Sequence, residues 1–320
     1  MTSWTASDIP DLAGRHAIVT GANSGLGLCT ALELARHGAH VVLAARDAAK
    51  GEAAREQISA ALAGTSGAGS TQLRSLDLAD LASVRAFATA VVDGEERLDL
   101  LVNNAGVMAI PRRTTADGFE MQLGTNHLGH MALTLLLLPA LVRTGSAHGT
   151  SRVVTVASGA HRFGRIDLED LMGERRYQPW RAYGQSKLAN LLFAFELQRR
   201  LDARGLPVAS YAAHPGYAST NLQSVGPQMR GSSLGARMAE WGNSLLAQPA
   251  EMGALSTLYA ATVPGLAPGS YIGPDGFMEQ RGHPRVVSST AAARDESMAS
   301  ALWARSEELV GVRFADVVPA

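Results

Sequence analysis

The sequence is poor in the features that mark secreted or nucleic-acid-binding proteins. It contains a single cysteine, Cys29, so no disulfide can form within the chain, which fits a reducing compartment. Charged residues make up only 18% of the 320 residues, the formal net charge is −1, and no long run carries one sign. We therefore expect neither a nucleic acid nor a charged membrane surface to be the main partner.

Long hydrophobic runs are also missing. The most apolar stretch, 130–142, is shorter than the roughly 20 residues that a membrane-spanning helix needs, and it contains Pro139. Residues 1–21 lack the charged and then apolar segments of a signal peptide. We expect a cytoplasmic protein without an integral membrane segment, whose 46% hydrophobic residues suffice for a sizeable core.

What the sequence does have is an alternation of short β-branched runs with longer helical patterns. The runs are too apolar for strands with one wet face, which predicts an α/β fold with a doubly wound, mostly parallel sheet covered by helices on both faces. The expected strands are 16–21, 40–46, 71–77, 98–106, 151–158, 207–216 and 269–273, and the expected helices are 27–38, 48–62, 81–92, 183–201, 248–262 and 294–310.

A further long helix is expected to begin near Asp117, where "DGFE" has the form of a capping box. No linker divides the chain, so 1–320 is predicted to form a single Rossmann-type domain with a core at about 13–285. The irregular segment 216–248 is interpreted as a substrate loop, and 286–320 as a C-terminal extension.

The turn "TGANSGLG" joins the first expected strand to the first expected helix. Glycines in such a turn let backbone N–H groups approach a pyrophosphate at the helix N-terminus, which predicts dinucleotide binding. The residues assigned to this contact are Gly21, Asn23, Ser24, Gly25, Leu26 and Gly27.

The end of the second strand indicates which dinucleotide is preferred. An acidic residue there would favour NAD, but the sequence places Arg46 after Ala45. A guanidinium suits a 2′-phosphate, so NADP(H) is favoured over NAD(H).

Tyr183 and Lys187 stand four positions apart, about one helical turn, so their side chains share a face. An ammonium beside a phenol stabilises the phenolate, so Lys187 is expected to lower the pKa of Tyr183 and make it a general acid and base. Ser158, at the end of the fifth expected strand, can polarise the same substrate oxygen.

These pieces together resemble the short-chain dehydrogenase/reductase family, from about residue 13 to past 280. "TGANSGLG" is similar to its cofactor turn, "NNAG" to its fourth-strand motif, and Ser158 with "YGQSK" to its catalytic serine and Tyr-x-x-x-Lys. The resemblance implies about seven strands and a hydride transfer between nicotinamide and the carbonyl or alcohol carbon of an apolar small molecule.

The resemblance also assigns roles to individual positions. Asn126 would complete a catalytic set with Ser158, Tyr183 and Lys187 by supporting a proton relay through water, and Tyr183 and Lys187 would also contact the cofactor. The remaining cofactor contacts that it implies are Asp77, Leu78, Asn103, Ala105, Gly106, Pro215, Gly216 and Thr220.

The motifs "NHLGHMALT" and "SGAHRFGRIDLEDL" are similar to the retinol-dehydrogenase-like branch, as is the insertion before Tyr183. One departure is Ala157, where many family members have a second serine. Membership of a branch does not name the substrate. A homodimer or homotetramer is also compatible with the family, although 286–320 would have to leave the pairing faces free.

The same residues allow other interpretations. The alternative is an NADP(H)-binding sensor or scaffold without turnover, and the spacing of Gly21, Gly25 and Gly27 argues against an epimerase of the extended branch. His127, His130, His161 and His214 lack metal-ligand spacing, so no metal is expected. Met229, Met238, Trp241 and Met252 fit a substrate pocket, the core or an oligomer contact equally well.

Overall fold

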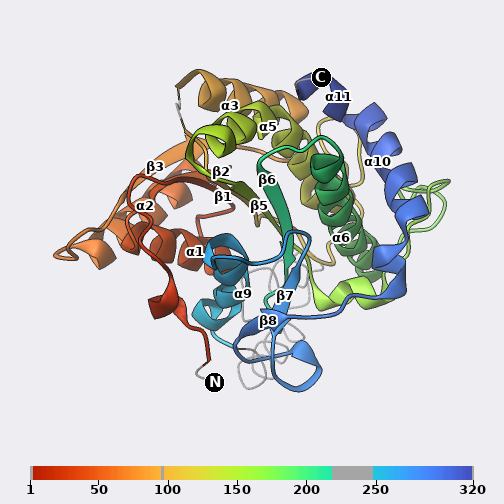
Figure 1. Ribbon diagram of the computed structural model, residues 1–320. Helices are drawn as coiled ribbons and strands as arrows, with labels where there is room; N and C mark the ends of the chain where they lie inside the picture. The colour runs from red at the N-terminus through yellow and green to blue at the C-terminus, as the bar shows by residue number, and fades with distance from the viewer. Residues whose placement is uncertain (1–2, 95–96, 218–247, 319–320) are drawn as a thin grey trace.

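The computed structural model describes residues 3–94, 97–217 and 248–318. Within them, eight strands form one sheet in the order β3-β2-β1-β4-β5-β6-β7-β8, in which every pair is parallel except β7 with β8 (Figure 1). The strands are β1 His16–Thr20, β2 His40–Ala45, β3 Ser70–Ser75, β4 Leu100–Asn103, β5 Ser151–Val156, β6 Val208–Ala213, β7 Tyr271–Pro274 and β8 Pro284–Val286.

The predicted α/β class and parallel sheet are confirmed, with eight strands instead of about seven. The additional strand, β8, has three residues and pairs antiparallel at the edge of the sheet, where Pro284 is tolerated. A three-residue strand is too short to show an alternating pattern, which is why the sequence did not reveal it.

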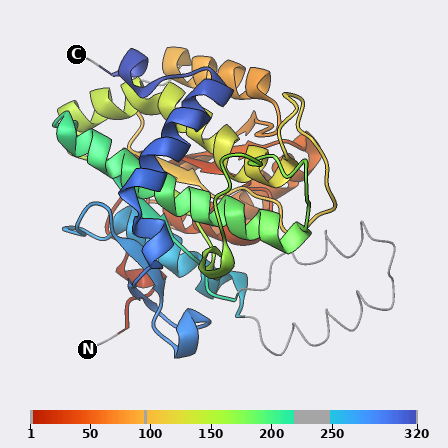
Figure 2. The ribbon, with the colours of Figure 1, turned by 90° about the vertical axis from the view of Figure 1, so that its right-hand side faces the viewer.

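Helices cover both faces of the sheet. One layer contains α1, α2 and α9, and the other contains α3, α5 and α6, with α10 and α11 outside α5 and α6 (Figures 1 and 2). Each face has its own apolar core, one around Val19 and Leu34 and the other around Leu101 and Leu191. The helices are α1 Gly25–Arg36, α2 Ala48–Leu62, α3 Leu81–Gly94, α4 Met121–Leu123, α5 Gly129–His148, α6 Pro179–Ala203, α9 Ala250–Thr262, α10 Glu296–Val310 and α11 Phe314–Val317.

The helical run that contains Asn126 starts later than predicted. Asp117 does not cap it, because its carboxylate accepts a hydrogen bond from Leu81 N instead. Glu120 is the N-cap, and its side chain accepts from the backbone of the first turn. Between α4 and α5 the chain makes one π-helical turn, 124–128, in which Gly129 N donates to Gly124 O.

The continuous helical run 121–148 is the one helix among the described residues that is long and apolar enough to cross a membrane. In its most apolar window, 78% of the residues are buried within the protein, between the sheet and the outer helices. A central core helix meets the same criteria of length and composition, so this feature alone does not indicate a membrane span.

Helix α6 begins four residues before Tyr183, at Pro179, and not at Tyr183 as the pattern suggested. Proline suits the first helical position because its missing N–H would have no partner there. Tyr183 and Lys187 therefore lie in the body of a 25-residue helix, where their backbone is rigidly held.

The C-terminal residues pack closely against the core. Trp303 of α10 stacks on Phe193 of α6 with ring centroids 5.6 Å apart, and the guanidinium of Arg200 lies 4.5 Å from the Trp303 ring. Ser306 lies within hydrogen-bonding distance of His127, at 3.0 Å. Helix α10 thus covers the outer face of α6.

Candidate active site

The glycine turn after β1 leaves room for a ligand backbone to approach. Gly21 and Gly25 have φ of 66° and 53°, which favours glycine. A Cβ on Gly27 would lie 2.4 Å from Gly21 O, so this glycine permits close packing of turn and helix. Ser24 does not cap α1 with its side chain, so the N–H groups of the first turn are available to an anion. The turn therefore fits the pyrophosphate of the predicted dinucleotide.

Two residues that sequence reasoning missed support this turn. Asn104 donates from Nδ2 to Thr20 O at 2.7 Å, and Thr20 Oγ1 accepts from the backbone N–H groups of Asn104 and Ala105 at 2.9 Å each. The end of β1 and the segment after β4 are thereby joined. Asn104 belongs to "NNAG", so the motif contained the signal, but nothing in the sequence shows which of its two asparagines holds the turn.

Arg46 follows β2 directly and its side chain is 71% exposed. Its guanidinium lies 3.8 Å from the Asp77 carboxylate, which follows β3. The two side chains stand together at the same edge of the sheet, where the adenosine end of the cofactor was predicted. The exposed Arg46 side chain can therefore turn toward a 2′-phosphate, and in doing so it would lose only a weak surface ion pair with Asp77.

The predicted catalytic group comes together at the ends of β4 and β5. Ser158, half-buried, hydrogen-bonds to the Tyr183 phenol and also caps the following turn by accepting from Ala160 N. Lys187 is buried, donates to Val156 O at 3.0 Å, and places its ammonium 5.9 Å from the centroid of the Tyr183 ring.

The protonation of this pair differs from the expectation. Burial raises the pKa of Tyr183, and the hydrogen bond from Ser158 opposes this only in part. Burial lowers the pKa of Lys187 to about 8. The prediction that Lys187 lowers the pKa of Tyr183 is wrong for the protein in this state, because desolvation dominates and the ammonium lies beside the ring.

Asn126 lies in the π-helical turn and is fully buried. Its Oδ1 accepts from Val107 N at 2.8 Å, and its Nδ2 donates to Val107 O and to Ser186 Oγ at 2.9 Å each. The side chain is thus committed to holding the backbone after Gly106, and the main-chain carbonyl of Asn126 lies 3.0 Å from His130 Nδ1. π-Turns of this kind are common at functional sites.

Gly106 lies between these groups. A Cβ there would be 3.0 Å from Asn126 Oδ1 and 3.7 Å from Lys187 Nζ. The structure therefore brings Gly106, Asn126 and Lys187 to one place and keeps it free of a side chain, which fits a cofactor lying against the backbone.

The other predicted cofactor residues make no contact that places them at the candidate site as clearly as Gly106. Asn103 is fully buried and donates from Nδ2 to Thr134 Oγ1, so its side chain does not face the cofactor edge. Leu78 is buried, whereas Ala105 is half-buried beside the glycine turn. Thr220 lies outside the described residues. Asn23, Ser24 and Leu26 are half-buried in the turn itself.

Pro215 and Gly216 follow β6 and are held by Gln248, which lies just before α9, and by the loop after β7. Gln248 donates from Nε2 to Pro215 O at 2.6 Å, and Tyr217 N donates to Gln280 O at 2.8 Å. Gly216 has φ of 65°, and a Cβ would meet Gln280 O at 2.4 Å. Of the predicted substrate loop 216–248, the described residues are Gly216 and Tyr217 at its start and Gln248 at its end. The two ends lie side by side, because Gln248 N donates to Tyr217 O at 2.8 Å.

A second group that the sequence analysis did not predict is an ionic cluster that includes Arg162, from the turn that follows Ser158. Glu279 Oε2 lies 2.8 Å from the Arg162 guanidinium and 3.2 Å from His214 Nε2. These two partners lower the pKa of Glu279 to about 2. Because its members come from three segments far apart in the sequence, no local pattern predicts the cluster. It ties the β7–β8 loop to the residues just before Pro215.

Aromatic side chains lie exposed near Tyr183. Trp180 meets the Tyr183 ring edge-on at 6.1 Å and is 49% exposed, and Phe163 packs against Gly184. Tyr217, at the stem of the loop, is also exposed. Exposed aromatic groups around a buried polar centre are typical of a site that receives an apolar molecule.

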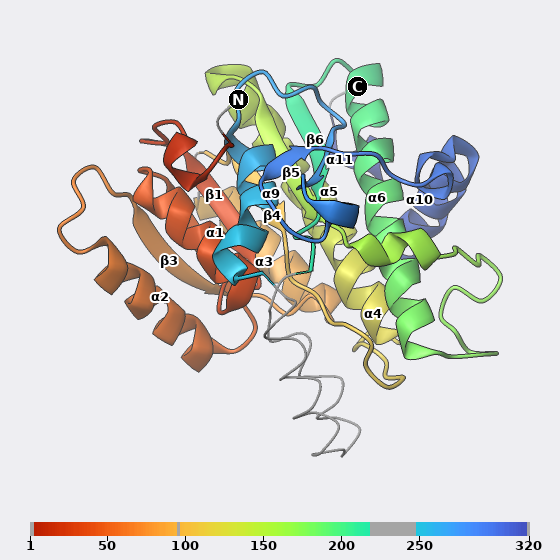
Figure 3. The ribbon, with the colours of Figure 1, turned by 90° about the horizontal axis from the view of Figure 1, so that it is seen from below.

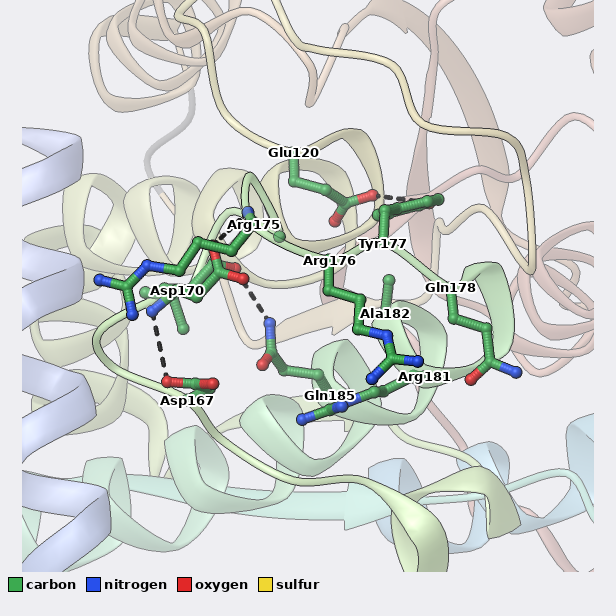
Figure 4. Close-up of a pocket in the computed structure, with 12 residues that line it drawn as sticks. Glu120, Asp167, Asp170, Arg175, Arg176, Tyr177, Gln178, Arg181, Ala182 and Gln185 are labelled. Carbon is green, nitrogen blue, oxygen red and sulfur yellow. Dashed lines mark hydrogen bonds between the residues drawn. The ribbon is translucent and has the colours of Figure 1, made fainter.

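A separate cavity of about 250 Å³ lies at the N-terminal end of α6, within the insertion before Tyr183 (Figure 4). Tyr177 accepts from Gln122 Nε2 at 2.8 Å and donates to Ile110 O, which attaches the insertion to the segment after β4. Neither Ser158 nor Tyr183 lines this cavity. Its lining residues are Glu120, Asp167, Asp170, Leu171, Gly173, Arg175, Arg176, Tyr177, Gln178, Arg181, Ala182 and Gln185.

The four histidines near the site are occupied by other contacts. His127 contacts Ser306, and His130 contacts Thr20 and Asn126 O. His161 Nδ1 contacts Ser158 O, and His214 Nε2 contacts Glu279. Among residues 3–94, 97–217 and 248–318, no group of three or more His, Cys, Asp or Glu side chains lies close enough to hold a metal ion.

Comparison with known proteins agrees with this geometry. The family model described as short chain dehydrogenase matches residues 15–230. The chain is 44% identical to polyprenol dehydrogenase of Mus musculus, over 96% of this chain and 87% of the relative. It is 43% identical to retinol dehydrogenase 13 of Homo sapiens, with the same coverage of both chains.

Solved structures show the same fold. An uncharacterised protein from Mycobacterium paratuberculosis is 49% identical, with a TM-score of 0.79 over 98% of this chain and 99% of the other. The RhlG/NADP complex of Pseudomonas aeruginosa is 30% identical, with a TM-score of 0.63 over 84% of this chain and 98% of the other. The fold and site define a nicotinamide-dependent oxidoreductase acting on CH–OH groups. The chain belongs to the short-chain dehydrogenase/reductase family, in its retinol-dehydrogenase-like branch.

Proposed function

We propose that the protein is an NADP(H)-dependent dehydrogenase or reductase that uses Tyr183 as its general acid and base on an apolar alcohol, aldehyde or ketone. The observation that carries this proposal is the group formed by the buried Tyr183 and Lys187 with the half-buried Ser158, beside the open backbone at Gly106. Bound nicotinamide supplies or accepts the hydride. The proton on the substrate oxygen is handled by the chain.

The roles of the side chains follow from their contacts. The raised pKa keeps Tyr183 a neutral phenol at neutral pH, so in reduction it can give its proton to the carbonyl oxygen while Ser158 donates a hydrogen bond to the same atom. In oxidation the direction of proton transfer is reversed, and Tyr183 accepts the proton from the alcohol oxygen. Lys187, fixed by Val156 O, lies beside the open backbone at Gly106, where it can bind the nicotinamide ribose.

Support for NADP(H) comes from Arg46, which stands exposed at the end of β2 without an acidic residue in the preceding strand end. Support for an apolar substrate comes from the exposed rings of Trp180 and Phe163 near Tyr183. Because relatives are named polyprenol and retinol dehydrogenases, isoprenoid alcohols and their aldehydes are the first compounds to test. We place this activity in the cytoplasm.

The test follows absorbance of the reduced cofactor as purified protein is mixed with NADPH or NADH and a panel of isoprenoid, aliphatic and aromatic aldehydes. We expect turnover with isoprenoid aldehydes and a higher kcat/KM with NADPH. Tight NADPH binding without turnover on any carbonyl compound would contradict the proposal and favour a cofactor-sensing protein instead.

A further inference from the structure

His130 is a buried histidine whose two ring nitrogens both have partners. It lies in the first turn of α5, four residues after Asn126. Its Nδ1 is 3.0 Å from Asn126 O, and its Nε2 is 2.9 Å from Thr20 Oγ1. The ring therefore links the π-helical turn to the end of β1.

The direction of each hydrogen bond in this chain follows from chemistry. A carbonyl oxygen only accepts, so Nδ1 must donate to Asn126 O. Burial lowers the pKa of His130 to about 4, so the ring is neutral at working pH and Nε2 has no proton. Nε2 then accepts from the Thr20 hydroxyl at 2.9 Å, which is closer than the other acceptor of that hydroxyl, Val102 O at 3.3 Å. The Thr20 oxygen in turn accepts from Asn104 N and Ala105 N.

The chain of contacts ends on both sides of the open position at Gly106. On one side, the Asn126 side chain accepts a hydrogen bond from Val107 N, and the main-chain carbonyl of Asn126 accepts one from His130. On the other side, Thr20 holds the backbone of Ala105. We propose that His130 is a positioning residue that locks the Asn126 turn to the cofactor turn and so sets the geometry around Gly106.

The neighbouring His127 provides a matched comparison. It is also buried in the same helical run, and burial likewise lowers its pKa, to about 3. Its contact is Ser306 of α10, on the side away from the cofactor turn. Loss of His127 should therefore affect stability, whereas loss of His130 should affect turnover.

This inference rests on the proposed function for its kinetic test. His130→Phe keeps a ring of similar size without hydrogen bonds and should lower kcat roughly tenfold or more, with a smaller change in KM. His130→Asn keeps a donor near the position of Nδ1 and should recover part of the loss. Thr20→Val should lower kcat similarly, and adding it to His130→Phe should cost little more, because both act on one chain of contacts.

The outcomes decide the matter. A His130→Phe protein with wild-type kcat, or one whose kcat falls no more than that of His127→Phe, would overturn the inference. So would fully additive effects of Thr20→Val and His130→Phe. If His130→Phe does not fold, the comparison of His130→Asn with wild type and the Thr20→Val protein serves the same purpose.

A second measurement does not depend on activity. Long-range ¹H–¹⁵N NMR spectra of the histidine side chains report which ring nitrogen bears the proton, with His130 assigned through His130→Asn. We expect a neutral Nδ1–H tautomer that persists as the pH is lowered toward 5 and is altered in Thr20→Val. An Nε2–H tautomer would overturn the inference even if hydride transfer is observed. If wild type shows no hydride transfer, the proposed function fails and the tautomer alone decides the role of His130.

Discussion

At the scale of single residues, the structure shows how strongly burial affects the two central side chains. Tyr183 and Lys187 are both buried. Burial raises the pKa of Tyr183 and lowers the pKa of Lys187, so it favours the neutral form of each side chain. Spacing in the sequence predicted that the two share a helix face, which is correct. It did not predict the direction of the Tyr183 shift, because desolvation depends on the whole surrounding fold.

Removing the buried lysine should change how stability depends on pH. The pKa of Lys187 is about 8 in the folded protein and 10.5 is its ordinary value, so between these values the unfolded chain binds more protons and stability rises with pH. Relative to Lys187→Met, wild type should gain up to about 2 kcal/mol in unfolding free energy from pH 8 to about 9.5. Urea unfolding at several pH values measures this difference.

The control for this experiment is Lys50→Met, which removes the only other lysine in the sequence, an exposed one. It should have the same pH dependence as wild type. A Lys187→Met protein whose unfolding free energy runs parallel to wild type across this range would show that Lys187 is not desolvated as described.

The exposed arginine after β2 should determine the choice of cofactor. A charged hydrogen bond contributes about 1.5–3 kcal/mol, so Arg46→Ala should weaken NADPH binding by roughly tenfold or more and leave NADH binding nearly unchanged. Titration of cofactor fluorescence measures both affinities. The control is Arg74→Ala, which removes a half-buried arginine of the adjacent strand β3. Equal weakening of both cofactors in Arg46→Ala would exclude Arg46 as the phosphate contact.

At the scale of elements, the long periodic segments were predictable and the short or irregular ones were not. The strands around β1, β2 and β5 and the body of α6 agree with the sequence pattern within a few residues. The predicted helix start near Asp117 was wrong, because Glu120 is the N-cap and the Asp117 carboxylate accepts from Leu81 N of α3. The π-turn has no sequence signature, since it differs from α-helix by one residue in hydrogen-bond register.

Helix α10 should contribute substantially to stability. Trp303 is buried between Phe193, Arg200 and Phe314, so Trp303→Ala should cost about 3–5 kcal/mol of unfolding free energy. Chemical denaturation followed by circular dichroism measures the loss. Phe277→Ala, which removes an aromatic ring that is 86% exposed, should change stability by less than about 0.5 kcal/mol. Similar values for the two variants would contradict the described packing.

At the scale of the whole molecule, the site is assembled where parallel strands end. The glycine turn follows β1, Arg46 follows β2, Gly106 follows β4, Ser158 follows β5 and Pro215 follows β6. Figure 3 shows α4, which belongs to the segment after β4, beside the N-terminal half of α6. Motif order predicted this convergence, because carboxyl ends of parallel strands share one edge.

The supporting contacts were beyond the reach of the sequence. The link from His130 to Thr20 joins residues 110 positions apart, and the contact between Arg162 and Glu279 joins residues 117 apart. Such pairs have no local pattern, so only the folded chain reveals them. The sequence thus predicts the reacting groups, and the structure shows which contacts hold these side chains in place.

The most direct test of the account compares wild type with Tyr183→Phe in hydride transfer from NADPH to an isoprenoid aldehyde. The variant keeps the ring and loses the proton, so kcat should fall by roughly 10²–10⁴-fold. The affinity for NADPH, titrated on the same samples, should stay close to that of wild type. A Tyr183→Phe protein that turns over at the wild-type rate would contradict the assignment of Tyr183 as the proton donor and acceptor.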